Sequence, residues 1–516
     1  MYCTIYSGAL LGVRAYLVSV EVDISRGLPA FYMVGSLSTE VRESRERVIV
    51  ALKNIGLEIP PCRITVNLSP ADRRKEGTAY DLPIAVGMLE ALEMIPKGAA
   101  EHMLFMGELG LNGEVKAARG VLPIVRAAEE KGIKECVVPL ANAREGAVIP
   151  GITVRGVSSI LDVIHFLTAQ NTDRENILPA AMVDVNALFD SKCQSQEEKR
   201  DFSEITGQEM ARRGAEIAAA GFHNLLMAGP PGAGKSMIAR RIPGILPSLT
   251  LEESLEVTAI VSVAGLLEEG RALVTERPFQ SPHHTISQPA LIGGSAVPRP
   301  GMISLTHRGV LFLDELPEFQ RSVLDALRQP IEERKVNIAR AGGNVTYPSD
   351  FMLVCAMNPC PCGYYPDKNR CHCTEPQVRR YMGRISGPIL DRIDLCVELQ
   401  QVEFAHLREG ARGESSADIR RRVVKARERQ RKRFEGTNYR FNGDIEASAI
   451  EKYCVLGPAE QHCMESLYSS LNLSARAYHR VLRVARTIAD LEEDEKIREE
   501  HLLEASFFRP SPEYWF

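Results

Sequence analysis

A chain of 516 residues, 45% of them hydrophobic and 25% charged, has the composition of a globular protein with about three domains. The formal net charge of −5 excludes a chain that is basic throughout, so any contact with nucleic acid has to come from local patches. No apolar run approaches the roughly 20 residues of a membrane span, and residues 1–23 lack the basic region and cleavage site of a secretory signal. We therefore expect a cytoplasmic protein with no membrane partner, whose 12 cysteines are buried thiols or metal ligands.

Residues 1–167 predict a domain of alternating strands and helices. Helical spacing of apolar residues marks 39–54, with Gly56 as its end, and marks 81–95 as a second helix. The run 118–142 combines a helical and a strand-like pattern. Strand-like composition marks three further segments, 4–12, 15–24 and 64–70. Polar residues then dominate 168–200, which we interpret as a linker.

The run LLMAGPPGAGKS at 225–236 places a turn rich in glycine and proline between a strand-like and a helix-like segment. It fits G-x-x-x-x-G-K-[ST], the P-loop, whose backbone N–H groups surround phosphate oxygens. Its lysine contacts the β- and γ-phosphates and its serine ligates Mg²⁺. The sequence thus predicts ATP and Mg²⁺ as cofactors, bound by Gly229, Pro230, Pro231, Gly232, Ala233, Gly234, Lys235 and Ser236.

A second nucleotide motif is VLFLDE at 310–315, in which four apolar residues suit a strand buried on both faces. Placing carboxylates at the end of such a strand costs free energy unless they have a functional role, and a nucleotide bound at the P-loop provides that role. Asp314 is predicted to hold Mg²⁺, directly or through water, and Glu315 to orient and polarise the attacking water. Together with the P-loop, the motif predicts ATP hydrolysis.

Three further polar residues follow in a fixed order. Asn358 ends another buried strand, MLVCAMNP, Arg392 lies in SGPILDRIDL, and Arg476 lies on a helix in the S-x-R pattern. This order resembles AAA+ ATPases of the magnesium-chelatase and MCM-helicase branch. The resemblance implies that Asn358 is sensor 1, that Arg392 is the arginine finger, and that Arg476 is sensor 2 on a helical lid, facing the nucleotide. A finger that acts on a neighbouring subunit implies a ring, and the family implies a homo-hexamer.

Two insertions also resemble this branch. Residues 279–308 form a segment rich in glycine and proline before the Asp-Glu strand, expected to be hairpin-like and similar to the helix-2 insert. Residues 331–348 alternate and turn at 342–343, which predicts a hairpin just before the sensor strand. In MCM-type helicases a basic residue on this hairpin contacts DNA in the ring pore, which here implies Arg340 and Lys335. The alternative is that Arg340 only solvates a turn.

Two C-x-C pairs lie between Asn358 and Arg392. Four thiolates from Cys360, Cys362, Cys371 and Cys373 can form a tetrahedral zinc site, and reduced cysteines without metal are the alternative. His372 is a substitute ligand. Farther on, the basic run 419–434 is interpreted as a solvated amphipathic helix with Val423, Val424 and Ala426 inward, and phosphate contact is its alternative.

The N-terminal region resembles the ribosomal-S5-type C-terminal domain of Lon protease, through GELGLNGEVKAARGVLPIVRAAEEKGIKECVVP. The catalytic serine of that family lies in K-D-G-P-S-A-G, where this chain has Lys75-Glu76-Gly77-Thr78-Ala79-Tyr80-Asp81. Its catalytic lysine lies in G-G-L-K, where this chain has Arg119-Gly120-Val121-Leu122. Because a Ser–Lys protease needs both groups, we expect a scaffold or partner-binding domain without proteolytic activity.

With SPHHTIS, NPCPCG and LDRIDL, the whole chain resembles the YifB/ComM family of bacteria. The fold class this implies is multidomain α/β, with a Lon-like domain at 1–167, a linker at 168–200, a P-loop AAA+ core at 201–400 and a helical lid with the C-terminal domain at 401–516. The implied function is a competence-associated hexameric helicase that promotes branch migration, with single-stranded or branched DNA and recombination proteins as partners. The rival is a magnesium-chelatase-like ATPase that remodels proteins and does not act on DNA.

Overall fold

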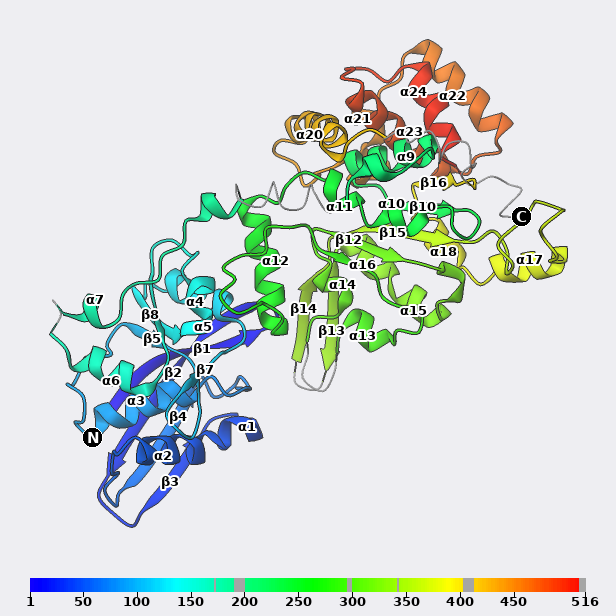
Figure 1. Cartoon of the computed structure of the whole chain (residues 1–516). Coiled ribbons are helices and arrows are strands. Elements are labelled where there is room, and N and C mark those ends of the chain that lie inside the picture. Colours follow the sequence, from blue (N-terminus) through cyan, green and yellow to red (C-terminus); the bar gives the residue numbers. More distant parts are fainter. Residues whose placement is uncertain (171–172, 190–199, 295–298, 341–342, 402–412, 510–516) are drawn as a thin grey trace.

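The computed structural model describes residues 1–170, 173–189, 200–294, 299–340, 343–401 and 413–509 (Figure 1). The N-terminal domain, the central sheet and the C-terminal helices follow one another along the molecule, coloured blue to cyan, green to yellow and orange to red. Among the described residues, no helix is long and apolar enough to cross a membrane.

The N-terminal domain is built on a seven-stranded mixed sheet with the order β3-β4-β2-β1-β5-β8-β9. The long antiparallel pair β1–β2 divides it, because β5, β8 and β9 continue parallel to β1 on one side, while β4 pairs antiparallel to β2 on the other. The strands are β1 Tyr2–Leu11, β2 Arg14–Ser25, β3 Ala30–Val34, β4 Arg63–Ser69, β5 Met103–Phe105, β8 Glu135–Pro139 and β9 Thr153–Val157, with β6 Glu108–Leu109 and β7 Val115–Lys116 as a separate pair.

The two helices predicted at 39–54 and 81–95 both form but differ in extent, and the second ends at Ala91. The predicted helix at 39–54 is broken at Glu43 into α1 Thr39–Arg42 and α2 Ser44–Asn54. Strands β3, β5 and β9 were not predicted. The residues of β3 are all exposed or half-buried at the sheet edge, so they show no alternating buried face. The remaining helices are α3 Asp81–Ala91, α4 Val121–Glu130, α5 Leu140–Gly146, α6 Ile160–Thr168 and α7 Arg174–Ile177.

The first part of the predicted linker at 168–200 packs against the N-terminal domain. Leu178 is buried and its carbonyl accepts a hydrogen bond from Arg155, and Ala181 N–H donates to the Val154 carbonyl at 2.8 Å. The chain is therefore still part of the domain beyond 168, and residues 190–199 lie outside the described residues.

The central part is a five-stranded parallel sheet with the order β11-β12-β15-β10-β16. Every residue of β12 and β15 is buried, as expected for strands covered on both faces. The strands are β10 Leu225–Ala228, β11 Phe279–Gln280, β12 Val310–Leu313, β15 Met352–Met357 and β16 Leu395–Glu398. The helices are α9 Glu209–Gly221, α10 Lys235–Ala239, α11 Ile242–Ile245, α12 Leu251–Ala264, α15 Arg321–Ala326, α16 Arg328–Glu333, α17 Glu375–Met382 and α18 Gly387–Leu390.

The two insertions are more helical than their sequences suggested. The segment expected to be hairpin-like at 279–308 contains α13 Gln288–Ile292 and α14 Met302–Leu305, joined through an antiparallel bridge between Gly293 and Pro300. The predicted hairpin at 331–348 forms as β13 Lys335–Arg340 and β14 Gly343–Pro348, but its first residues belong to α16. Residues 295–298 and 341–342 lie outside the described residues.

The C-terminal helices pack beside the central sheet. They are α20 Ser416–Arg433, α21 Ile450–Tyr453, α22 Pro458–Ser470, α23 Ala475–Leu491 and α24 Glu499–Phe507. Val423 and Ala426 of α20 are buried as predicted, whereas Val424 is only half-buried. Cations of α20 form ion pairs within the chain, including Arg422 with Glu414, Lys425 with Glu493 and Arg433 with Asp490. These pairs favour the interpretation of α20 as a packed amphipathic helix over phosphate contact.

Candidate nucleotide-binding site

The P-loop leaves β10 at the carboxyl edge of the parallel sheet, where ligands of open α/β folds bind. A Cβ at Gly229 would lie 2.5 Å from the Leu399 carbonyl oxygen, so only glycine fits there. Gly232 and Gly234 have φ angles of +78° and +92°, and a Cβ on either residue would have no neighbour within 4 Å. The loop therefore surrounds open space and fits a polyphosphate.

Lys235 is held toward this space. It begins α10, and its Nζ donates to the carbonyl oxygens of Gly229 and Pro230 at 2.6 and 2.9 Å and to Asn358 Oδ1 at 3.0 Å. Burial lowers the pKa of Lys235, and the nearby Asp314 carboxylate opposes this effect. The partners of the ammonium are neutral oxygens, so anionic phosphate oxygens in the loop would be stronger acceptors.

Ser236, on α10, and Asp314, directly after β12, come together at the phosphate site. Ser236 Oγ donates to Asp314 Oδ2 at 2.6 Å, and Asp314 Oδ1 accepts from the Glu315 N–H at 3.0 Å. A hydroxyl and a carboxylate are ligands that Mg²⁺ takes beside substrate phosphates. Bound Mg²⁺ would neutralise charge on those phosphates. The residues present thus fit the cofactors that the P-loop implies.

Glu315 follows Asp314 in the left-handed region, at φ +53°. Its side chain is 56% exposed, and its Oε2 lies 3.4 Å from His284 Nδ1. Leu313 and Leu316 on either side are fully buried, so the unusual backbone turns the carboxylate out of the core at the edge of the phosphate site. This placement suits a group that orients water.

Sequence reasoning missed His284. It lies in the insert at 279–308, about thirty residues before Glu315 in the chain, and its ring packs on His283 with centroids 4.1 Å apart. The run SPHHTIS contains this histidine, but only the folded chain brings it to the Asp-Glu strand. Its contact with Glu315 makes it a candidate for controlling the orientation of that carboxylate.

Arg392 and Arg476 lie at the opposite, amino edge of the sheet. The Arg392 carbonyl accepts from Asn224 Nδ2 at 2.8 Å, and Asn224 immediately precedes β10. The Arg392 guanidinium contacts the Glu332 carboxylate and the Pro388 carbonyl. The Arg476 side chain is 74% exposed, and its guanidinium contacts the Asp391 carboxylate. The expectation that Arg476 faces the nucleotide of its own chain does not agree with this arrangement, and the catalytic roles of both arginines stay predictions.

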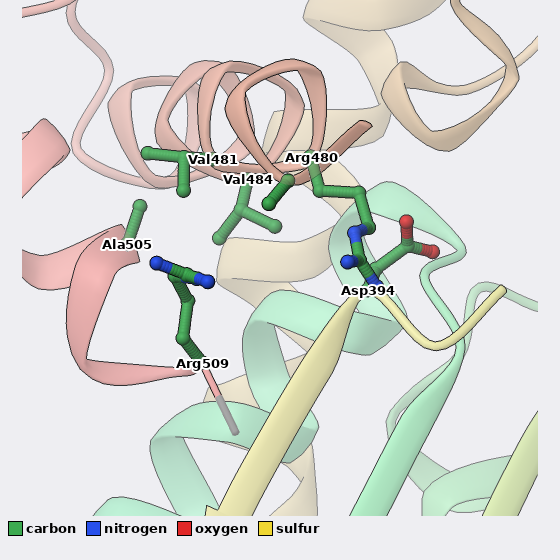
Figure 2. A pocket seen from close by; sticks show the side chains of 7 residues that line it. Asp394, Arg480, Val481, Val484, Ala505 and Arg509 are labelled. Atoms are coloured by element: carbon green, nitrogen blue, oxygen red, sulfur yellow. The ribbon is translucent and has the colours of Figure 1, made fainter. Parts of the chain in front are cut away.

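The same edge joins the C-terminal helices to the sheet. Asp394 immediately precedes β16, and its carboxylate accepts from the Asn224 N–H at 3.1 Å and from Arg483 of α23 at 3.4 Å. Figure 2 shows Arg480 reaching from α23 toward Asp394, and Arg480 donates to the Leu390 and Ile393 carbonyls. α23 is thereby tied to the segment that carries Arg392.

The remaining predicted residues lie beyond the phosphate site. The four predicted zinc ligands converge, with every sulfur within 4.8 Å of the others: Cys360, Cys362, Cys371 and Cys373. His372 is exposed and lies outside this group.

The predicted DNA cations lie on the hairpin. Lys335 begins β13, its side chain is 50% exposed, and its Nζ lies 3.8 Å from Glu333 Oε2. Arg340 ends β13, and its side chain lies outside the described residues.

A parallel sheet with a P-loop, a buried Asp-Glu strand and an asparagine on the neighbouring strand defines a P-loop ATPase. Three family descriptions match the chain: "Subunit ChlI of Mg-chelatase" at 20–142, "Magnesium chelatase, subunit ChlI" at 201–407 and "Magnesium chelatase, subunit ChlI C-terminal" at 413–509.

Relatives extend this similarity over nearly the whole chain. Competence protein ComM of Haemophilus influenzae is 42% identical over 509 residues, which cover 98% of this chain and 97% of that protein. Protein YifB of Escherichia coli, described as uncharacterized, is 42% identical over 506 residues, covering 98% and 96%. Lon protease 2 of Bacillus subtilis is 27% identical over 169 residues, 31% of this chain. The chain belongs to the YifB/ComM family of magnesium-chelatase-like AAA+ ATPases.

Proposed function

We propose that this protein is a hexameric ATP-driven motor that acts on DNA, as a helicase that promotes branch migration during natural transformation and homologous recombination. Single strands and branched junctions are its DNA partners, and recombination proteins are candidate protein partners. The observation that carries the proposal is the similarity over 98% of the chain to a protein named for competence.

The pre-sensor hairpin, β13–β14, supports the DNA part of the proposal. Val336, Ile338, Val345 and Tyr347 are buried, whereas Lys335, Asn337, Asn344 and Thr346 alternate with them on an exposed polar face. Only Ser349, Asp350 and Phe351 separate β14 from β15, the strand that ends beside Asn358. A shift of Asn358 on hydrolysis would therefore reach the hairpin through one buried strand.

Assembly into a ring is supported by the two edges of the central sheet. Glu315 lies at the carboxyl edge and Arg392 at the amino edge, so one subunit can present Arg392 to a nucleotide held by the next. Repeating that contact closes a ring when the rotation between subunits is a simple fraction of a turn.

A three-strand DNA junction with one labelled strand tests the motor. The full-length protein with ATP and Mg²⁺ is expected to displace the labelled strand, and Lys235→Ala is expected to displace none. The matched control is Lys97→Ala, an exposed lysine of the N-terminal domain, which should behave as the parent. Equal product from the parent and Lys235→Ala would refute the proposal.

A protein-remodelling ATPase is the second candidate, favoured by the three magnesium-chelatase family matches. It predicts ATP hydrolysis that single-stranded DNA leaves unchanged. The motor predicts hydrolysis that rises when DNA is added, because the hairpin and Asn358 belong to one connected segment.

A further inference from the structure

The four cysteines beyond Asn358 have the spacing of ligands around one ion. The Sγ atoms of Cys360 and Cys362 lie 3.3 Å apart, those of Cys360 and Cys371 3.8 Å, and those of Cys362 and Cys371 3.6 Å. Sulfurs arranged tetrahedrally at about 2.3 Å from a single Zn²⁺ are separated by about 3.8 Å. A disulfide, by contrast, brings two sulfurs to about 2.05 Å.

The surroundings of the four sulfurs also suit a metal thiolate. Gly363 and Tyr365 donate their N–H groups to Cys360 Sγ at 3.2 and 3.4 Å, which stabilises a negative sulfur and orients it. Cys360 is fully buried, and the other three are half-buried. Four thiolates at these distances would repel one another, and a divalent cation would offset that repulsion.

The loop that contains the sulfurs has an exposed tip and a centre formed by the four cysteines. It runs from the end of β15 to Thr374, which caps α17, and residues 366–370 are all exposed. The sulfurs of Cys360 and Cys362 in its first half meet that of Cys371 in its second half. The Arg370 guanidinium also lies over the Tyr364 ring, 4.3 Å from its centroid. A structural metal ion can stabilise the fold of a loop that is too small to bury an apolar core of its own.

We propose that these four thiolates bind one structural Zn²⁺ per chain, and that the metal-bound loop positions the phosphate site. Four sulfur ligands leave no open coordination position, which excludes a catalytic role for the ion. Thiolate ligands also favour zinc over Mg²⁺ or Ca²⁺, which take oxygen ligands.

The positioning role follows from two contacts. Asn358, the partner of Lys235 Nζ, lies two residues before Cys360. On the other side, a Cβ on Gly363 would lie 2.5 Å from Cδ of Pro231 in the P-loop, so the loop packs directly on the phosphate-binding turn. Loss of the ion would therefore loosen both the amide partner of Lys235 and the support of the P-loop. The positioning role depends on the proposed ATP site, whereas the metal site itself does not.

Metal analysis of the full-length protein tests the site. Protein purified under reducing conditions without chelators or a metal-affinity tag is expected to contain about one zinc per chain. The double substitution Cys362→Ser with Cys373→Ser should lose it. The matched control removes two half-buried cysteines elsewhere, Cys62→Ser with Cys463→Ser, and should keep it. Zinc absent from the parent, or equal in both double variants, would overturn the site, and iron in its place would overturn its identity.

Substitution with Co²⁺ gives a second measurement of the site, and this measurement does not require the variants to fold. Parent protein depleted of zinc and supplied with Co²⁺ should show the visible absorption of a tetrahedral cobalt thiolate, which added Zn²⁺ removes. Absence of that absorption would contradict a four-sulfur site.

Nucleotide binding then tests the positioning role. Depletion should weaken the affinity for a fluorescent ATP analogue by roughly 10-fold or more, and zinc should restore it, with the Cys62/Cys463 variant as the control. Unchanged affinity after verified depletion would leave the metal site standing and overturn its link to the P-loop. If the parent binds no nucleotide with or without zinc, it is the proposed ATPase that fails.

Discussion

At the scale of single residues, Lys235 and Glu315 serve different stages of one reaction. Lys235 is buried among oxygens at the phosphate position, where it can contact bound nucleotide before any chemistry. Glu315 is turned outward beside the site, where it can act on water only in the chemical step.

Substitutions at these two residues should separate binding from hydrolysis. Lys235→Ala is expected to weaken nucleotide binding and abolish hydrolysis, because it removes a contact made in the ground state. Glu315→Gln is expected to keep nucleotide affinity and lower turnover by about 100-fold or more. Equilibrium titration with a fluorescent ATP analogue and steady-state phosphate release measure the two effects, with the exposed Glu318→Gln as the control. Normal turnover by Glu315→Gln would contradict its assignment.

At the scale of elements, the pre-sensor hairpin has one buried and one polar face, so exposed substitutions can change its contacts without disturbing packing. Removal of the two predicted DNA cations, Lys335→Ala with Arg340→Ala, should keep basal ATP hydrolysis and assembly. DNA-stimulated hydrolysis and strand displacement should fall by about 10-fold or more, because both depend on phosphate contacts.

The control for the hairpin is Arg126→Ala, an arginine of the N-terminal domain that is 60% exposed. Strand displacement at the parental rate by the hairpin variant would place the DNA contact elsewhere. The segment 419–434 would then be the next candidate, although several of its cations already have carboxylate partners.

The junction between β16 and α23 predicts a dependence of stability on pH. Burial alone would raise the pKa of Asp394, but Arg483 and His223 outweigh it and lower the pKa from 3.8 to about 2. A carboxyl whose pKa is lower in the folded state stabilises the fold above pH 3.8, and the contribution is lost as pH falls toward 2. The shift corresponds to about 2 kcal/mol.

Thermal unfolding of Asp394→Asn and of the parent, followed from pH 5 to pH 2, measures this contribution. The parent should be the more stable at pH 5, and the difference should shrink as pH falls below about 4. A difference that stays constant over this range would contradict the pKa assigned to Asp394. Asp367→Asn, at an exposed position in the cysteine loop, is the matched control.

At the scale of the whole molecule, the N-terminal domain is joined to the ATPase through α12, which lies beside α4 in Figure 1. The Gly120 N–H donates to the Ser262 carbonyl at 3.3 Å, and Ser262 Oγ donates to the buried Glu145 carboxylate. Gly265, which ends α12, lies against Arg119. The run 119–122, which corresponds to the lysine run of Lon protease, thus forms part of a contact with the chain's own ATPase core.

A second contact joins the same domain to the pre-sensor hairpin. Val13, in the β1–β2 turn, packs with the apolar cluster of the hairpin, and a Cβ on Gly12 would lie 2.8 Å from Cγ1 of Val345. The N-terminal domain therefore touches both the helix that follows the P-loop region and the element proposed to contact DNA. This arrangement agrees with a scaffold role.

The opposite placement of Glu315 and Arg392 predicts complementation between subunits. Arg392→Ala alone should keep nucleotide binding and lose hydrolysis by roughly 1,000-fold, the effect of removing an arginine finger. Mixed with Glu315→Gln subunits, it should regain part of the activity, since some interfaces then combine an intact Arg392 with an intact Glu315.

Phosphate release from mixtures at several ratios measures this effect. A mixture of Arg392→Ala with the double variant Arg392→Ala/Glu315→Gln is the control and should stay inactive. If the first mixture also stays inactive while its subunits co-assemble, the arginine does not act across an interface.

Features that lie within short segments could be predicted from the sequence alone. The P-loop, the Asp-Glu strand and the strand of Asn358 could be predicted because their apolar runs require buried parallel strands. The carboxyl ends of such strands meet at one edge. Accordingly, Ser236 hydrogen-bonds to Asp314, and Lys235 hydrogen-bonds to Asn358.

Contacts between distant segments could not be predicted in this way, because they depend on tertiary packing. His284 reaches Glu315 only because the insert folds back on the Asp-Glu strand, and Arg476 joins Asp391 only because α23 docks at the amino edge. The contact of 119–122 with α12 likewise depends on how two separately folded sheets meet. No local periodicity encodes these contacts, because side-chain packing between domains depends on the shapes of both surfaces and not on spacing along either segment.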